Sequence, residues 1–159
     1  MLHSLIIDRL GADDVPAIVR LLETANAADR RYFTPFQYTF EAVDAAIKPM
    51  VKDGIYGVTQ AVKHGSRDLL AFYMLRGLDE GYPAPMYGVF VAPTARRVGI
   101  ASLTIRHAIT LCKLNRFPSL MLKVFPENQA AVGAYVAMGF KPLRDEPPQR
   151  VMQLELERP

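Results

Sequence analysis

The order of apolar and polar residues along the chain predicts alternating strands and helices. Short apolar runs bounded by Gly, Pro or charged residues are typical of strands, whereas apolar residues spaced three or four apart predict an amphipathic helix. In chain order the predicted elements are strand 2–10, a helix over 15–22, helix 41–50, strands 55–62, 69–76 and 87–91, a helix from 101, strand 119–124, helix 128–138, and closing strands 140–143 and 151–156.

Breaker residues mark the connections between these elements. Pro93 follows the strand that ends at Val91, because proline cannot donate to a strand ladder, and Gly139 ends the helix before it. Residues 64–68, His-Gly-Ser-Arg-Asp, predict a hairpin connection. The polar segment 144–150 contains two prolines, and we expect it to connect the closing strands rather than to link two domains.

Composition and charge fit one domain spanning residues 1–159. Of the 159 residues, 50% are hydrophobic and 22% charged, values typical of a soluble globular core. The net charge of +3 is spread along the sequence, which does not indicate nucleic-acid binding. Asp8, Arg9, Asp13 and Asp14 are unlike a signal peptide, and no apolar run approaches the roughly 20 residues that span a bilayer. We therefore expect a cytoplasmic protein without a membrane partner.

The chain has a single cysteine, Cys112, which excludes an intrachain disulfide and fits a reducing compartment. It shares the spacing of Ala101, Ile105 and Ala108, one apolar stripe of the predicted helix. This position favours a buried thiol over a nucleophile.

The segment 96–101, Arg-Arg-Val-Gly-Ile-Ala, has the composition of an anion-binding turn between a strand and a helix. The first N–H groups of a helix lack partners within it, and with the helix dipole they favour an anion. Gly99 and Ala101 keep these amides accessible, while Arg96 and Arg97 add positive charge suited to phosphate. The alternative interpretation is an ordinary tight turn with two solvated arginines.

A second segment begins about one strand further along the chain. Asn128 is placed to cap a helix, and Tyr135 follows it by about two helical turns, so both lie on roughly the same face. The tyrosine can thus point where the loop points. Alternatively, Asn128 is a cap without a ligand, and Tyr135 is a core aromatic that packs with Ala131 and Met138.

Taken together, the two segments resemble the GNAT superfamily of N-acetyltransferases. The acetyl-CoA loop of that family reads Arg/Gln-x-x-Gly-x-Gly/Ala, which Arg96, Gly99 and Ala101 match. Its later segment reads Asn-x-x-Ala-x-x-x-Tyr-x-x-x-Gly-Phe, and this chain carries all five residues at that spacing from Asn128 to Phe140. The first half of the chain resembles the family only through its order of elements.

The resemblance implies an α+β fold with a mixed, mostly antiparallel central sheet of about six or seven strands. About four helices would flank the sheet, with a splay between the fourth and fifth strands. The implied cosubstrate is acetyl-CoA, with no metal. Phe90 and Val91 would present strand backbone to the pantetheine arm, and Asn128 would orient the cofactor. The pyrophosphate would lie on the main-chain amides of Arg97, Val98, Gly99, Ile100, Ala101 and Ser102.

The implied reaction moves an acetyl group to a primary amine by direct attack in a ternary complex. An amide near Phe90 would polarise the thioester carbonyl. Tyr135 would be the general acid for the departing thiolate, because a phenol with a reference pKa of about 10 is protonated at neutral pH. Many family members carry an acidic residue or a histidine on the strand before the loop, but residues 86–91 contain neither. The general base stays unassigned: deprotonation through water or by a residue of the first half of the chain is open, and four nearby titratable residues each have a solvated alternative: Asp79, Glu80, His64 and His107.

The acceptor is not specified by the motifs. Residues 32–40 hold five of the 15 aromatic residues, and this segment either packs against the core or forms an acceptor wall. Tyr82 and Tyr87 have the same two interpretations. Small-molecule amines and protein amines both fit the resemblance, as does a homodimer. The alternative function is a CoA-binding sensor or structural module without transferase activity, and a generic nucleotide-binding domain is a weaker third.

Overall fold

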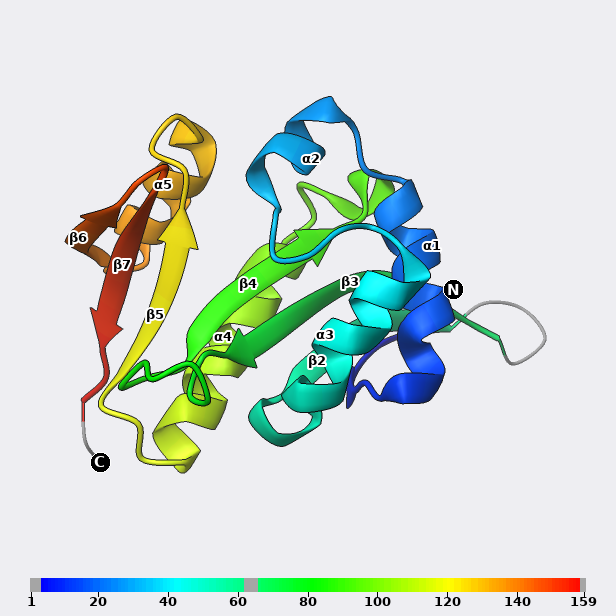
Figure 1. Ribbon diagram of the computed structural model, residues 1–159, viewed down its shortest axis with the longest axis horizontal. Coiled ribbons are helices and arrows are strands. Elements are labelled where there is room, and N and C mark those ends of the chain that lie inside the picture. The colour runs from blue at the N-terminus through cyan, green and yellow to red at the C-terminus, as the bar shows by residue number, and fades with distance from the viewer. Residues whose placement is uncertain (1–3, 62–65, 158–159) are drawn as a thin grey trace.

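The computed structural model describes residues 4–61 and 66–157, which form a seven-stranded sheet with helices on both faces (Figure 1). Among the helices of these ranges, none has the length and apolar character to cross a membrane. The elements are β1 (Leu5–Arg9), the 3-10 helix η1 (Ala12–Asp14), α1 (Val15–Glu23), α2 (Ala27–Tyr32), α3 (Phe40–Asp53), β2 (Ile55–Ala61), β3 (Arg67–Arg76), β4 (Met86–Val91), the 3-10 helix η3 (Pro93–Ala95), α4 (Ile100–Leu114), β5 (Ser119–Val124), α5 (Gln129–Ala137), β6 (Lys141–Glu146) and β7 (Gln149–Glu155).

The strands lie in the order β1-β2-β3-β4-β5-β7-β6. Neighbouring strands are antiparallel except for β4 and β5, which run parallel. This one parallel pair meets only at Met86 with Met121 and at Tyr87 with Leu122. Beyond these residues the two strands diverge, as Figure 1 shows between the green and yellow arrows. The predicted mixed sheet and its splay between the fourth and fifth strands are confirmed.

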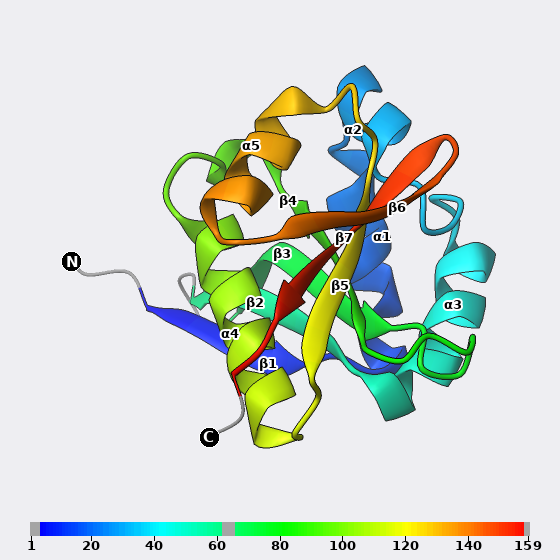
Figure 2. The same ribbon diagram turned by 90° about the vertical axis from the view of Figure 1, so that its left-hand side faces the viewer.

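Strand β3 is buried on both faces of the sheet, which explains its nearly continuous apolar sequence. Phe72 and Met74 pack in the cluster formed with α1 and α3, whereas Tyr73 and Leu75 pack in the cluster formed with α4. Figure 2 shows α4 on one side of the sheet and α1 and α3 on the other. Cys112 of α4 lies in the second cluster and is buried, as its spacing predicts.

One element was not expected from the sequence, and one expectation about the elements is wrong. The sequence patterns did not indicate α2, a helix of six residues without a buried side chain. The segment 144–150 is not a connection, since β6 extends to Glu146 and β7 begins at Gln149. β6 is an exposed edge strand that carries charged residues at four of its six positions, and ion pairs such as Arg150 with Asp145 hold it to β7. The hairpin predicted at 64–68 lies partly outside the described residues.

Candidate active site

The loop before α4 places main-chain N–H groups at a helix N-terminus. Arg97 and Gly99 both have left-handed backbones, with φ of 63° and 91°, and Gly99 is the N-cap of α4. The N–H of Leu103 is the first to bond within the helix, to the carbonyl of Gly99 at 2.9 Å. The preceding amides of the first turn therefore stay available to a ligand. Backbone conformation rather than space requires the glycine, because a Cβ at Gly99 would meet nothing within 4 Å.

The guanidinium of Arg96 is engaged within the protein. Its Nε and Nη2 donate to the carbonyl of Val91 at 3.1 and 3.0 Å, and Nη2 lies 2.8 Å from the carboxylate of Asp29 in α2. Arg96 thus braces the loop between the end of β4 and α2, a role beyond the phosphate charge expected from the sequence. Arg97, by contrast, is exposed at the turn.

The parting of β4 from β5 exposes main-chain groups of β4. The N–H of Ala92 donates to β3, at the carbonyl of Leu70, and the carbonyl of Pro85 accepts from Met121 of β5. Main-chain groups of successive strand residues point to opposite sides, so those of Val89 and Val91 face the gap on the β5 side. The groups of Phe90 instead face β3, so of the two residues expected to present open strand backbone only Val91 faces the gap, together with Val89.

Helix α5 forms the opposite side of the gap. The side chain of Asn128 caps it by accepting from the N–H of Ala131 at 3.4 Å, so the capping interpretation holds. Tyr135 packs its ring 5.7 Å from that of Phe140, and its hydroxyl has no hydrogen-bond partner among the described residues. Burial raises the pKa of Tyr135 to about 12. The helix ends at Gly139, whose φ is 95°, as predicted.

These elements enclose a cavity of about 660 Å³. Of the eleven residues that the sequence assigned to the site, Val98 does not line it, and its side chain is 73% exposed. Residues of α2, which the sequence patterns missed, also contribute to the wall. The ten assigned residues that line the cavity are Phe90, Val91, Arg96, Arg97, Gly99, Ile100, Ala101, Ser102, Asn128 and Tyr135.

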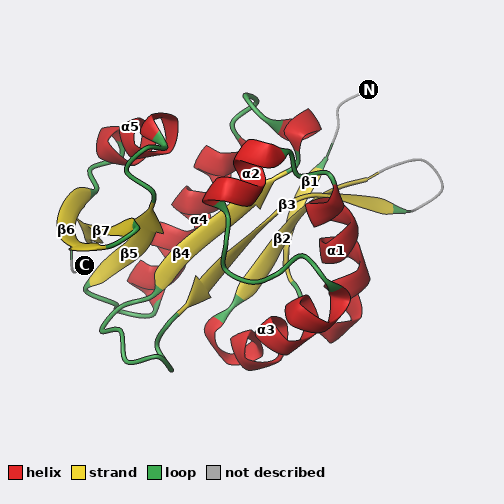
Figure 3. Cartoon of the chain, turned by 45° about the horizontal axis from the view of Figure 1, so that its top comes forward, coloured by secondary structure: helices red, strands yellow, loops and turns green. Residues whose placement is uncertain are grey.

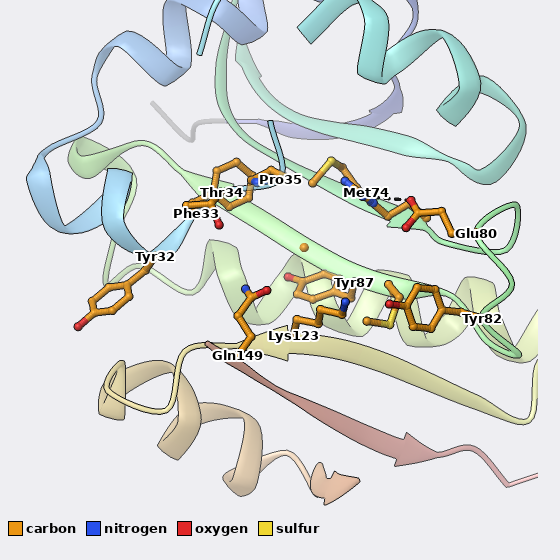
Figure 4. Close-up of a pocket in the computed structure, with 13 residues that line it drawn as sticks. Tyr32, Phe33, Thr34, Pro35, Met74, Glu80, Tyr82, Tyr87, Lys123 and Gln149 are labelled. Atoms are coloured by element: carbon orange, nitrogen blue, oxygen red, sulfur yellow. Dashed lines mark hydrogen bonds and ion pairs between the residues drawn. The ribbon is translucent and has the colours of Figure 1, made fainter. Parts of the chain in front are cut away.

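A second, smaller cavity of about 220 Å³ adjoins the first (Figure 4). It is lined by the end of α2 and the segment after it, by the first half of β4 and by Lys123 of β5, and Figure 3 shows α2 in front of the sheet. The two cavities lie next to each other, because they share five lining residues: Tyr32, Phe33, Tyr87, Gly88 and Lys123. Sequence reasoning missed Arg76, Lys123 and Gln149, which come from three strands and carry no motif.

The aromatic segment 32–40 packs against the core and also lines the smaller cavity. The ring of Phe33 lies 5.8 Å from that of Phe72 and 5.5 Å from that of Phe90, in the core. The hydroxyl of Tyr38 donates to the carbonyl of Phe33 at 2.6 Å. Packing against the core is thus confirmed, and residues 32–35 at the same time line the smaller cavity.

The four candidate bases lie in different surroundings. His107 was expected on the helix surface but is partly buried, with Nδ1 hydrogen bonded to the hydroxyl of Tyr73, and it lines neither cavity. Burial lowers the pKa of His107. Glu80 lines the smaller cavity and pairs with Arg76 at 3.0 Å, whereas Asp79 is exposed outside both. His64 lies outside the described residues.

Tyr87 is buried against α4, and its hydroxyl shares a hydrogen bond of 2.8 Å with that of Thr104. Burial raises the pKa of Tyr87 well above its ordinary value. Tyr87 thus packs in the core and also lines both cavities, whereas Tyr82 lines only the smaller one.

The model of the acetyltransferase (GNAT) family matches residues 21–140. The chain belongs to this family. The predicted resemblance is confirmed, and the match includes both motifs. No curated protein matches the chain in sequence. In residues 4–61 and 66–157, no group of three His, Cys, Asp or Glu side chains could hold a metal ion.

Solved structures share the GNAT fold at low sequence identity. A domain from Methanocaldococcus jannaschii is 10% identical, with a TM-score of 0.76 over 98% of this chain and 100% of that one. An N-acetyltransferase from Staphylococcus aureus is 17% identical, with a TM-score of 0.72 over 97% and 99%. Spermidine N-acetyltransferase from Vibrio cholerae, in complex with CoA and spermine, is 19% identical, with a TM-score of 0.73 over 96% and 95%. At these identities the likeness shows the fold.

Proposed function

We propose that the protein is an N-acetyltransferase that moves the acetyl group of acetyl-CoA to a primary amine by direct attack in a ternary complex. The observation that carries the proposal is that two neighbouring cavities share Gly88 of β4 as a lining residue. One cavity has helix N–H groups and an open strand edge suited to the donor, and the other offers a separate space for the acceptor.

The larger cavity fits the chemistry of acetyl-CoA at both ends. The amides that begin α4 receive the pyrophosphate, with Arg97 adding charge from the exposed side. The pantetheine arm carries amides, and it lies along the main-chain groups of Val89 and the N–H of Val91 in the way an added strand would, since Arg96 occupies the carbonyl of Val91. Asn128 caps α5 beside this arm. The thioester then reaches Gly88, where the two cavities meet.

At this junction the acceptor nitrogen bonds to the acetyl carbon, and the bond from that carbon to sulfur breaks. A main-chain N–H of Val89 or Val91 donates to the carbonyl oxygen as it gains negative charge. Single donors of this kind contribute roughly 2.7 to 4 kcal/mol to the transition state. β4 carries no acid or histidine, and the carboxylate of Glu80 in the smaller cavity is paired with Arg76, so we assign to solvent the proton that the nitrogen loses.

Tyr135 assists the departure of sulfur. Its pKa of about 12 keeps the phenol protonated at neutral pH, with its hydroxyl free to donate. A thiol has a reference pKa of about 8.5, below that of Tyr135, so complete proton transfer to the thiolate would be uphill. We therefore assign Tyr135 the donation of a hydrogen bond to the developing thiolate, with the thiol proton supplied finally by solvent.

Two measurements test the proposal. Calorimetric titration with acetyl-CoA measures donor binding, and thiol release across a panel of amines measures transfer. We expect Tyr135→Phe to lower kcat by about tenfold or more while leaving the Kd of acetyl-CoA unchanged. Tyr56→Phe is the matched control, since Tyr56 stacks on Tyr73 and lines neither cavity.

Each outcome has a distinct meaning. Binding of acetyl-CoA without release to any amine would support the sensor or structural module instead. Full turnover by Tyr135→Phe would remove the assigned role of the phenol. Failure to bind acetyl-CoA would contradict both functions.

A further inference from the structure

The smaller cavity is lined by more positive than negative side chains. Arg76 of β3 and Lys123 of β5 are its cations, and Glu80 is its carboxylate. Glu80 pairs with Arg76. Lys123 pairs with Glu146 at 2.7 Å, but Glu146 is also held by Arg144 at 2.8 Å. One carboxylate therefore serves two cations, and the group as a whole retains one positive charge.

The positive side chains gather at one end of this cavity. Figure 4 shows Lys123 extending toward Tyr82, with Glu80 at the same end and Tyr32 at the other. The ammonium of Lys123 lies 5.2 Å from the centre of the Tyr82 ring, which attracts and orients it. Gln149 adds a neutral donor to the wall. A cation held in this way presents its remaining N–H groups to an entering anion.

We propose that the acceptor is a small amine that also carries an anionic group, a carboxylate or a phosphate, and that Lys123 and Arg76 bind this group. The proposal rests on the proposed transferase function. The amine points to Gly88, where the cavities meet, and the anionic group points to the cationic end. A volume of about 220 Å³ lies below the roughly 300–1,000 Å³ of pockets for drug-sized ligands, which favours a small acceptor.

The same charges disfavour a polyamine. A second ammonium on the acceptor would meet Lys123 and Arg76, and like charges brought together in a cavity discriminate strongly between substrates. This chain is thus expected to differ in acceptor from the spermidine N-acetyltransferase whose fold it shares.

The experiment compares amines that differ only in the anionic group. Thiol release from acetyl-CoA is measured with the common L-amino acids, phosphoethanolamine and spermidine, and with counterparts that lack the acid. Ethanolamine is the counterpart of both serine and phosphoethanolamine, so the carboxylate and phosphate arms share one reference. We expect at least one anionic amine to exceed its counterpart in kcat/KM by about tenfold or more.

Variants of the two cations then show whether they cause the preference for the anionic amine. In Lys123→Gln and Arg76→Gln, the ratio of kcat/KM between the anionic amine and its counterpart should fall about tenfold or more. Lys113→Gln is the control, because Lys113 is exposed on α4 and lines neither cavity, and its ratio should equal that of the parent protein.

The results that would overturn the inference are separable from failure of the function itself. Turnover of spermidine, or of the counterparts that lack the acid, at or above that of the anionic amines would reject the acceptor class while leaving the transferase intact. An unchanged ratio in both variants would reject the two cations as its ligands. If acetyl-CoA binds but no amine releases CoA, the transferase function fails and the acceptor class with it.

Discussion

Replacing Gly99 by alanine tests whether the loop before α4 needs a left-handed backbone at this residue. Gly99 has a φ of 91°, and a Cβ built there meets nothing within 4 Å. The substitution therefore adds no steric conflict with a neighbour, and its cost comes from the left-handed backbone alone. Gly133 in α5 provides the matched control, since a Cβ there also meets nothing within 4 Å but the backbone is helical.

The expected magnitude follows from comparing the two variants. Both replace glycine by alanine, so they share the loss of unfolded-state freedom, and this contribution cancels in the difference. What remains is the left-handed strain of about 1–2 kcal/mol. In a chain of this size each kcal/mol shifts the Tm by about 2–4 °C, so Gly133→Ala should melt roughly 2–8 °C above Gly99→Ala.

Thermal unfolding of the two variants by calorimetry measures this difference. Titration with acetyl-CoA adds a second comparison, because a shifted loop weakens phosphate binding only in Gly99→Ala. Equal Tm values for the two variants would refute the claim that Gly99 is required by its backbone conformation. Equal affinity for acetyl-CoA would refute the assignment of the loop to the donor.

Three further predictions concern charge and protonation. Asp29→Asn keeps a polar group at the start of α2 but loses the charge that faces Arg96, so thermal unfolding should show a Tm about 2–4 °C lower than in the parent protein. Asp44→Asn is the control, because it breaks an exposed pair within α3, and its Tm should fall less. Equal losses of Tm in the two variants would contradict the bracing role of Arg96. His107 has a lowered pKa in the folded protein, so its contribution to stability is present above about pH 6.5 and is lost as the pH falls. Urea unfolding should therefore show a smaller loss between pH 7 and pH 5 in His107→Gln than in the parent, and parallel curves would reject this. Tyr135, with its pKa raised to about 12, contributes stability that is present below about pH 10 and is lost as the pH rises toward 12, and Tyr135→Phe should flatten that part of the unfolding curve.

The parts of the site that sequence reasoning found are those built from local spacing. Gly99 follows Arg96 by three residues and Tyr135 follows Asn128 by seven, so helix and turn geometry alone places each pair. Family resemblance then related the two segments to each other. The splay of β4 from β5 also came from that resemblance, since no residue pattern in either strand indicates it.

The parts that sequence reasoning missed depend on contacts between distant segments. His107 stands beside an apolar stripe and was expected at the surface, but its partner Tyr73 is 34 residues away. Arg96 was assigned to phosphate from its place in the loop. The splay leaves the carbonyl of Val91 without a strand partner and Arg96 bonds to it, a contact that the sequence does not indicate. Helix α2 was missed because it buries no side chain and so has no apolar periodicity.

The short seam between β4 and β5 divides the sheet mechanically. Only two residue pairs join β5, β7 and β6 to the other four strands through the ladder, so this seam is where the sheet opens most readily. An extended molecule lying along Val89 and Val91 would supply the missing rungs and fasten the two halves together. The free energy of unfolding would then rise by an amount set by the concentration and affinity of that molecule, so the stability of the sheet would measure how fully the gap is occupied.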